Sequence, residues 1–232
     1  MSGTLKPLRL RWTLATPMVV GAHPLHLDAL VAFAMTEVAL RNSPVANPSF
    51  AELAKDLPLG RAEEGALWCW QASALSVDTA SHAMRYWTRK TDTDDYSARV
   101  AAGQIEGRFK FPLKAFAYKI DTQRGLFKQQ FKFFPVKQVH TVTAWCIGDE
   151  ELLGNLLDPN AGLVTHLGGK ARMGMGKIAS FEIVHDEEAH HRWTRRVLPW
   201  PHEESVPVRM AVRPPYWDIA NISDAYVNPS IL

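Results

Sequence analysis

Apolar and polar residues follow strand-like patterns in four stretches of the chain. Near the N-terminus, Leu10, Trp12 and Leu14 alternate with Arg11 and Thr13, so one face of the strand is apolar and the other polar. The remaining stretches either alternate in the same way or are apolar on both faces, as in a buried strand. Strands are therefore predicted over residues 9–20, 66–75, 136–147 and 178–184.

Two stretches repeat their apolar residues at helical spacing. The first begins at Asp28, which is placed to cap a helix, and runs to about Arg41, before Asn-Ser-Pro at 42–44. The second covers residues 149–157 and precedes the fourth predicted strand. The resulting order is strand, helix, strand, insertion, strand, helix, loop, strand. This order predicts an α+β fold of the ferredoxin-like or RRM-like type (βαββαβ).

The predicted elements divide one domain into a core, an insertion and an extension. Residues 1–76 and 136–185 form the ferredoxin-like core. Residues 77–135 form an insertion, because they are too many and too charged for an ordinary connection. Residues 186–232 form a C-terminal extension, with one further strand predicted over residues 206–212.

The composition is that of a soluble globular protein. The 232 residues are 47% hydrophobic and 22% charged. No run approaches the roughly eighteen apolar residues of a membrane span, and the N-terminus lacks the apolar core of a signal peptide. We therefore expect a cytoplasmic protein with no membrane partner. Cys69 and Cys146 are isolated in apolar surroundings, which predicts buried thiols, no metal site and no cofactor.

Positive charge is concentrated in one third of the chain. The net charge is only +2, but residues 85–140 carry twelve Lys or Arg against five Asp or Glu. The rest of the chain carries fourteen against nineteen and is therefore acidic. Such a local excess favours an anionic partner such as nucleic acid, the alternative being a solvated charged face.

Cations and aromatic residues are interleaved within this basic region. Residues 85–90 hold three cations around two aromatics, and residues 108–111 and 127–134 alternate cations with aromatics, with a turn at 121–125. The pattern predicts an extended basic hairpin, or thumb. Its cations would neutralise phosphates, and its rings would either stack on unpaired bases or pack inward. A hairpin whose aromatics all belong to the core is the alternative.

A glycine-rich loop follows the second predicted helix. Residues 167–178 contain four glycines and three cations, so the backbone can approach a ligand closely while the side chains supply positive charge. A Walker loop is excluded because Ala171 stands at its first glycine position and Ile178 at its hydroxyl position. A dinucleotide fingerprint is excluded because residues 174–176 open a strand, not a helix. The loop is either a polyanion site or a tight connection with incidental cations.

The order helix, Gly-Gly-Lys-x-Arg-x-Gly-x-Gly, strand resembles the RAMP (repeat-associated mysterious protein) superfamily, whose ferredoxin-like subunits bind guide RNA in CRISPR effectors. The first strand and residues 22–30 are similar to the start of the small subunit of type IV complexes, which caps the 5′ handle of the guide. The resemblance implies a non-catalytic protein whose glycine loop and thumb contact the CRISPR RNA. It also implies three further partners: target DNA near the protospacer-adjacent motif, the backbone subunit and the large subunit.

The expected RNA contacts come from the loop, the insertion and the turn before the first helix. They are Gly168, Gly169, Lys170, Arg172, Met173, Gly174, Gly176 and Lys177; Arg85, Arg89, Lys90, Arg108, Phe109, Lys110, Lys114, Lys128, Phe131 and Lys132; and His26.

Two other functions fit the same residues. A metal-independent endonuclease of the same superfamily needs a base, an acid and cations around the reacting phosphate, roles open to His23, His26 and His140 together with the cations of the thumb. A general binder of single-stranded RNA, outside any CRISPR system, needs only the basic and aromatic residues.

Overall fold

The computed structural model describes residues 4–21, 23–43, 49–104 and 121–231. The chain forms two compact units. The core unit comprises Met1–Ala83 and Val136–Leu232, and the inserted unit comprises Met84–Pro135. Strands β4 and β5 belong in part to each unit, and the units are described separately below.

A four-stranded antiparallel sheet forms the centre of the core unit. Its strands are β1 (Leu5–Leu14), β4 (Ser76–Arg89), β5 (Gln130–Asp149) and β6 (Ile178–His185), in the order β4-β5-β1-β6. Strand β1 runs antiparallel to both β5 and β6. The connection from β1 to β4 contains a long helix, and the connection from β5 to β6 contains another α-helix, which is the split βαβ plan. The predicted α+β, ferredoxin-like fold class is therefore confirmed.

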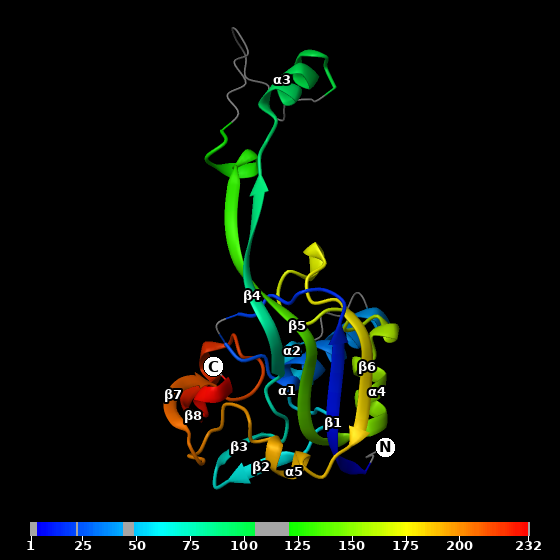
Figure 1. The fold of residues 1–232 in the computed structure, drawn as a ribbon, viewed down its shortest axis with the longest axis vertical. Coiled ribbons are helices and arrows are strands. Elements are labelled where there is room, and N and C mark those ends of the chain that lie inside the picture. Colours follow the sequence, from blue (N-terminus) through cyan, green and yellow to red (C-terminus); the bar gives the residue numbers. More distant parts are fainter. Residues whose placement is uncertain (1–3, 22, 44–48, 105–120, 232) are drawn as a thin grey trace. The chain divides into compact units, whose positions relative to one another are not determined.

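Helices α1 (Leu27–Asn42) and α4 (Glu150–Leu157) pack against one face of this sheet and against each other (Figure 1). The alternation in β1 explains this packing, because Leu8, Leu10 and Trp12 are fully buried while the intervening arginines are exposed. The apolar side chains of the helices and of β1 belong to one hydrophobic cluster. Burial of this cluster is the main source of stability for the core unit.

The opposite face of the sheet is partly covered by the C-terminal extension. Trp145 lies beside Arg9 on this face, yet only 6% of its surface is exposed. The short helix α5 (Ala189–Arg192) contributes the guanidinium of Arg192, which lies 4.9 Å from the centre of the Trp145 ring. This distance is typical of a cation–π contact.

The second strand of the sheet is not the predicted stretch 66–75. Those residues instead include β3 (Leu67–Trp70), which pairs with β2 (Arg61–Glu64) in a separate two-stranded sheet. The strand that joins the main sheet is β4, at its edge. Most β4 side chains are exposed, so the strand has no buried face and no apolar alternation by which to detect it.

The C-terminal extension contains a hairpin with its own small core. Strands β7 (Val206–Ala211) and β8 (Ile222–Val227) pair antiparallel and enclose Val212 and Ala225. The strand predicted over residues 206–212 is confirmed, whereas β8 was not predicted.

The inserted unit holds α3 (Thr93–Ala101) between the ends of β4 and β5. The Asp92 carboxylate caps α3 by accepting hydrogen bonds from the amides of Asp94 and Asp95. The predicted arm 108–111 lies outside the described residues, and the described strands of this unit are parts of β4 and β5. The remaining short elements are α2 (Phe50–Leu53), η1 (Gly125–Phe127), η2 (Pro159–Ala161), η3 (Ala171–Met173), η4 (Ile219–Asn221) and η5 (Pro229–Ile231).

A buried ion pair joins the extension to the start of α1. The Arg196 guanidinium donates to the Asp28 carboxylate at 3.0 Å and to the Tyr216 hydroxyl at 2.8 Å, and that hydroxyl donates to Asp28. Asp28 was predicted to cap α1, but it lies in the first turn and His26 occupies the cap position. The guanidinium also donates to the carbonyls of Trp70, Ala72 and Val212.

The ionised states of this pair depend on each other. Burial raises the pKa of Asp28, and the neighbouring Arg196 partly offsets that rise. Burial opposes the charge on Arg196, but Asp28, Tyr216 and Cys69 together outweigh burial, and the pKa of the guanidinium is raised. Removal of either partner therefore leaves an uncompensated charge in the core.

We predict that Arg196→Met lowers the free energy of unfolding by about 3–5 kcal/mol, because Asp28 is left buried without its partner. Urea denaturation measures this loss, and the exposed Arg209→Met is the control. The pair Asp28→Leu with Arg196→Met should recover part of the stability. A single variant as stable as the control would show that the pair does not hold the extension in place.

Candidate functional site

The glycine-rich loop is held against the residues that follow β1. The amide of Gly169 donates to the carbonyl of Val19, and the amide of Gly176 donates to the carbonyl of Pro17, both at 2.8 Å. The Thr16 hydroxyl donates to the Gly174 carbonyl and accepts from the Lys177 amide. The loop is thus fixed at several points by the core unit.

Two of the loop glycines are required by this close approach. Gly168 has φ +79°, and a Cβ added there would lie 2.5 Å from the Val19 carbonyl oxygen. Gly176 has φ +69°, and a Cβ added there would collide with the Leu167 carbonyl. Both positions favour glycine through conformation and through space, since side chains rarely adopt positive φ.

The loop presents three successive amides that have no acceptor within the described residues. Lys170 adopts the left-handed conformation (φ 64°, ψ 33°), and the right-handed 3-10 turn η3 follows it directly. This alternation of hand turns successive amides toward one concave side, a nest that suits an anion. Among the described residues, the amides of Lys170, Ala171 and Arg172 donate no hydrogen bond.

The cations of the loop surround this nest and are exposed. The side chains of Lys170, Arg172 and Lys177 all face solvent, and no carboxylate among the described residues forms an ion pair with them. Positive side chains therefore lie in the same turn as backbone amides that have no acceptor in the described structure. Together these groups can hold a phosphate through charge and hydrogen bonds.

The inserted unit carries a cluster of exposed aromatic rings on one face of its strands. Successive side chains of a strand point to opposite sides, so Tyr86 of β4 lies on the face opposite Arg85. The Tyr86 ring lies 5.9 Å from that of Phe131, and Phe131 lies 4.7 Å from Phe133. The exposed fractions of these three side chains are 69%, 62% and 58%. Rings this exposed are available to stack on a ligand.

The structure brings the predicted loop residues together, and His26, another predicted contact, is not among them. Seven of the eight predicted loop residues are exposed on the core unit, whereas Gly176 is buried, which corrects its prediction as an RNA contact. Arg85, Arg89, Lys90, Lys128, Phe131 and Lys132 are exposed on the inserted unit. Tyr86 and Phe133 were not included in the predicted site, although their alternation with cations was a usable signal. The predicted contacts Arg108, Phe109, Lys110 and Lys114 lie outside the described residues.

His26 was predicted to contact RNA, and its position corrects that prediction. Only 2% of the residue is exposed. Its ring stacks on Tyr216 at 4.5 Å, and its Nε2 accepts a hydrogen bond from the Val197 amide. Burial lowers the pKa of His26 well below its ordinary value, and the nearby Arg196 lowers it further. The ring is thus a neutral part of the core, without access to an RNA ligand.

The described residues contain neither a metal site nor a membrane helix. Within them, no group of three or more His, Cys, Asp or Glu side chains is arranged to hold a metal ion. No helix in the described part of the chain is long and apolar enough to cross a membrane. Burial raises the pKa of Cys69 to about 11 and raises that of Cys146 as well, in agreement with the predicted buried thiols.

The fold and the loop define a class of protein: an α+β protein of ferredoxin-like architecture with a cationic, glycine-rich loop before its last sheet strand. Within that class, the model of the family described as CRISPR type IV associated protein Csf3 matches residues 6–228. The chain belongs to this family and is therefore a type IV CRISPR-associated protein. No curated protein matches the chain.

We predict that His26 makes stability depend on pH. The folded state keeps the ring neutral, whereas the unfolded ring takes up a proton near its ordinary pKa of about 6.5. The unfolded state therefore binds more protons below that pH, and stability falls by up to about 1.4 kcal/mol per pH unit. Urea denaturation between pH 7.5 and about 5.5 measures this fall.

The variant His26→Gln removes the titrating ring and should give a flatter stability profile over the same range. His140→Gln, at an exposed position of β5, is the control and should keep the slope of the unmodified protein. Parallel profiles for all three proteins would contradict a neutral, buried His26.

Proposed function

We propose that this protein is a guide-RNA-binding subunit of a type IV CRISPR ribonucleoprotein and a member of the RAMP superfamily. In this proposal it caps the 5′ handle of the CRISPR RNA and helps to recognise the protospacer-adjacent motif on target DNA. The observation that carries the proposal is the match to the type IV family over residues 6–228. The neighbours in the complex are the backbone and large subunits.

The glycine-rich loop supports a contact with the RNA backbone. Three amides without an acceptor in the described structure and the side chains of Lys170 and Arg172 occupy one exposed turn. Such groups recognise phosphate oxygens, which are the same at every nucleotide. The loop therefore contributes affinity and register, with little dependence on the RNA sequence.

The inserted unit supports a contact with unpaired bases. Its exposed rings at Tyr86, Phe131 and Phe133 offer apolar surfaces, and the cations lie on the alternate positions of the same strands. Aromatic rings stack on bases of any identity, and neighbouring cations hold the backbone. This arrangement fits a single-stranded handle better than a duplex, whose bases are not available for stacking.

The proposal assigns no catalytic role to the chain, and a cleavage assay tests that part. The purified protein is incubated with repeat RNA in the absence of metal, and we expect the RNA to remain intact. A specific cleavage product would instead support the endonuclease of the same superfamily. Its candidate histidines are then His23 and His140, since both are exposed and His26 is buried.

We predict that the double variant Lys170→Ala with Arg172→Ala weakens handle binding equally for unrelated RNA sequences, since these cations contact phosphates. The dependence of log K on log salt should flatten by roughly 0.7 for each phosphate that the variant no longer binds. Fluorescence anisotropy at several salt concentrations measures both effects. Lys55→Ala with Arg209→Ala, two exposed cations outside the loop, is the control. An unchanged salt slope in a folded loop variant would overturn the assignment of the loop.

We predict that Phe131→Leu lowers RNA affinity by about 1–3 kcal/mol, because a base can no longer stack on the ring. Its melting temperature should change little, since the ring is 62% exposed. The matched variant Phe134→Leu, at a position 7% exposed on the same strand, should do the reverse. The comparison uses anisotropy for affinity and thermal unfolding for stability, and identical behaviour of the two variants would exclude stacking at Phe131.

A further inference from the structure

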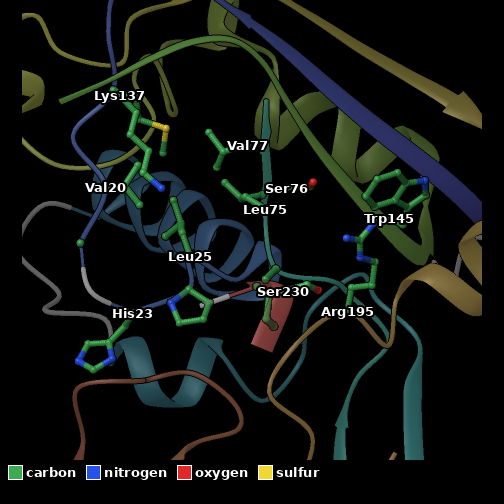
Figure 2. A pocket seen from close by; sticks show the side chains of 15 residues that line it. Val20, His23, Leu25, Leu75, Ser76, Val77, Lys137, Trp145, Arg195 and Ser230 are labelled. Atoms are coloured by element: carbon green, nitrogen blue, oxygen red, sulfur yellow. The ribbon is translucent and has the colours of Figure 1, made fainter. Parts of the chain in front are cut away.

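A small cavity lies in the core unit beside the residues that hold the glycine-rich loop (Figure 2). Its volume is about 180 Å³. Its wall is formed by Met18, Val20, Gly21 and residues 23–25 after β1, by residues 74–77 at and just before the start of β4, and by side chains from β5 and the C-terminal extension. The groups that matter below are Leu75, Ser76, Lys137, Arg195 and Ser230.

The cavity has two cations and no acid in its wall. Figure 2 shows the ammonium of Lys137 and the guanidinium of Arg195 on opposite sides of the cavity, with Ser76 between them and His23 pointing away. Among the residues that the structure describes, no Asp or Glu lines the cavity and neither cation forms an ion pair. Both side chains are partly buried, so water screens their charges only in part.

Both cations are positioned by the fold. The backbone of Lys137 exchanges two hydrogen bonds with Met18, at 2.8 and 2.9 Å. The carbonyl of Arg195 accepts from the Ala74 amide at 2.8 Å, and its guanidinium lies 6.0 Å from the Trp145 ring. The backbone positions from which the two cations extend are therefore fixed before any ligand arrives, which lowers the entropic cost of binding.

Size and charge identify the class of ligand. Pockets for drug-sized molecules measure about 300–1,000 Å³, so this smaller cavity suits one compact group. Two uncompensated cations favour an anion, and the hydroxyls of Ser76 and Ser230 can donate hydrogen bonds to its oxygens. A phosphate group meets each of these conditions.

The cavity and the loop share one segment of backbone. Met18 pairs with Lys137 of the cavity, and the next residue, Val19, accepts the hydrogen bond from Gly169 of the loop. An RNA strand whose sugar-phosphate backbone lies on the loop thus passes close to the cavity. We propose that the cavity between Lys137 and Arg195 binds one phosphate group of the RNA strand held by the loop, an inference that rests on the proposed function.

The first experiment uses inorganic phosphate and the full chain, without RNA. Phosphate is titrated at low ionic strength and followed by amide NMR shifts. We expect shifts over residues 74–77 and at Lys137, and an apparent Kd that rises about tenfold or more in Lys137→Gln with Arg195→Gln. Arg192→Gln is the control, because Arg192 also lies against Trp145 but pairs with Glu188 and does not line the cavity. Shifts confined to residues 168–174, or equal affinity in the cavity variant and the control, would overturn the proposal.

The second experiment locates the phosphate within the RNA. Handle RNAs ending in a 5′-phosphate, a 5′-hydroxyl or a 3′-phosphate are compared by anisotropy. If the cavity holds a terminal phosphate, the RNA that is phosphorylated at that end binds more tightly than the others, and the cavity variant loses this preference. If the cavity holds an internal phosphate, RNA affinity does not depend on the end groups. The dependence of log K on log salt then flattens by roughly 0.7 in the cavity variant. If a folded cavity variant shows neither of these effects, the proposal is overturned. If the unmodified protein binds no handle RNA while free phosphate still binds the cavity, the proposed function fails and the cavity site stands.

Discussion

The buried guanidinium of Arg196 is the group on which the arrangement of the core unit depends. Moving a charge out of water costs several kcal/mol unless it is paired and fully hydrogen-bonded. Arg196 meets that condition only when the start of α1 supplies Asp28 and the extension supplies Tyr216 and the Val212 carbonyl. The pair therefore fixes how the extension lies on the core unit. Because Arg195 is adjacent in sequence, the same contacts also help to position its backbone, whose carbonyl accepts from the Ala74 amide.

Close contact between backbones holds the glycine-rich loop in place on the rest of the core unit. The amides of Gly169 and Gly176 donate hydrogen bonds to residues 17–19, whereas the amides of residues 170–172 donate to no acceptor among the described residues. Gly168 and Gly176 allow this approach because a side chain at either position would meet a carbonyl oxygen. The loop is consequently rigid where it meets the core and open where it meets a ligand, as preorganised binding requires.

Residue patterns predicted most of the sheet, because β1, β5 and β6 each have a buried and an exposed side. They placed the second strand wrongly, because the edge strand β4 has little buried surface to set a periodicity. Asp28 and His26 were misassigned for a different reason. Each acts through contacts with residues more than 160 positions away in the sequence, at Arg196 and Val197, and no local pattern reports such contacts. The loop was found because glycines and cations at close spacing constrain the backbone and the charge locally.

The cations of the core unit differ in what surrounds them, and that difference separates structural charges from binding charges. Arg196 is buried and compensated, and Arg192 is paired with Glu188. An unpaired cation on an open surface carries little information, because exposed ion pairs contribute only about 0–1 kcal/mol. Lys137 and Arg195 are different, since they line a confined cavity without an acidic partner in the described structure. An anion that enters this cavity meets both cations away from bulk water, where their attraction is screened less than at an open surface.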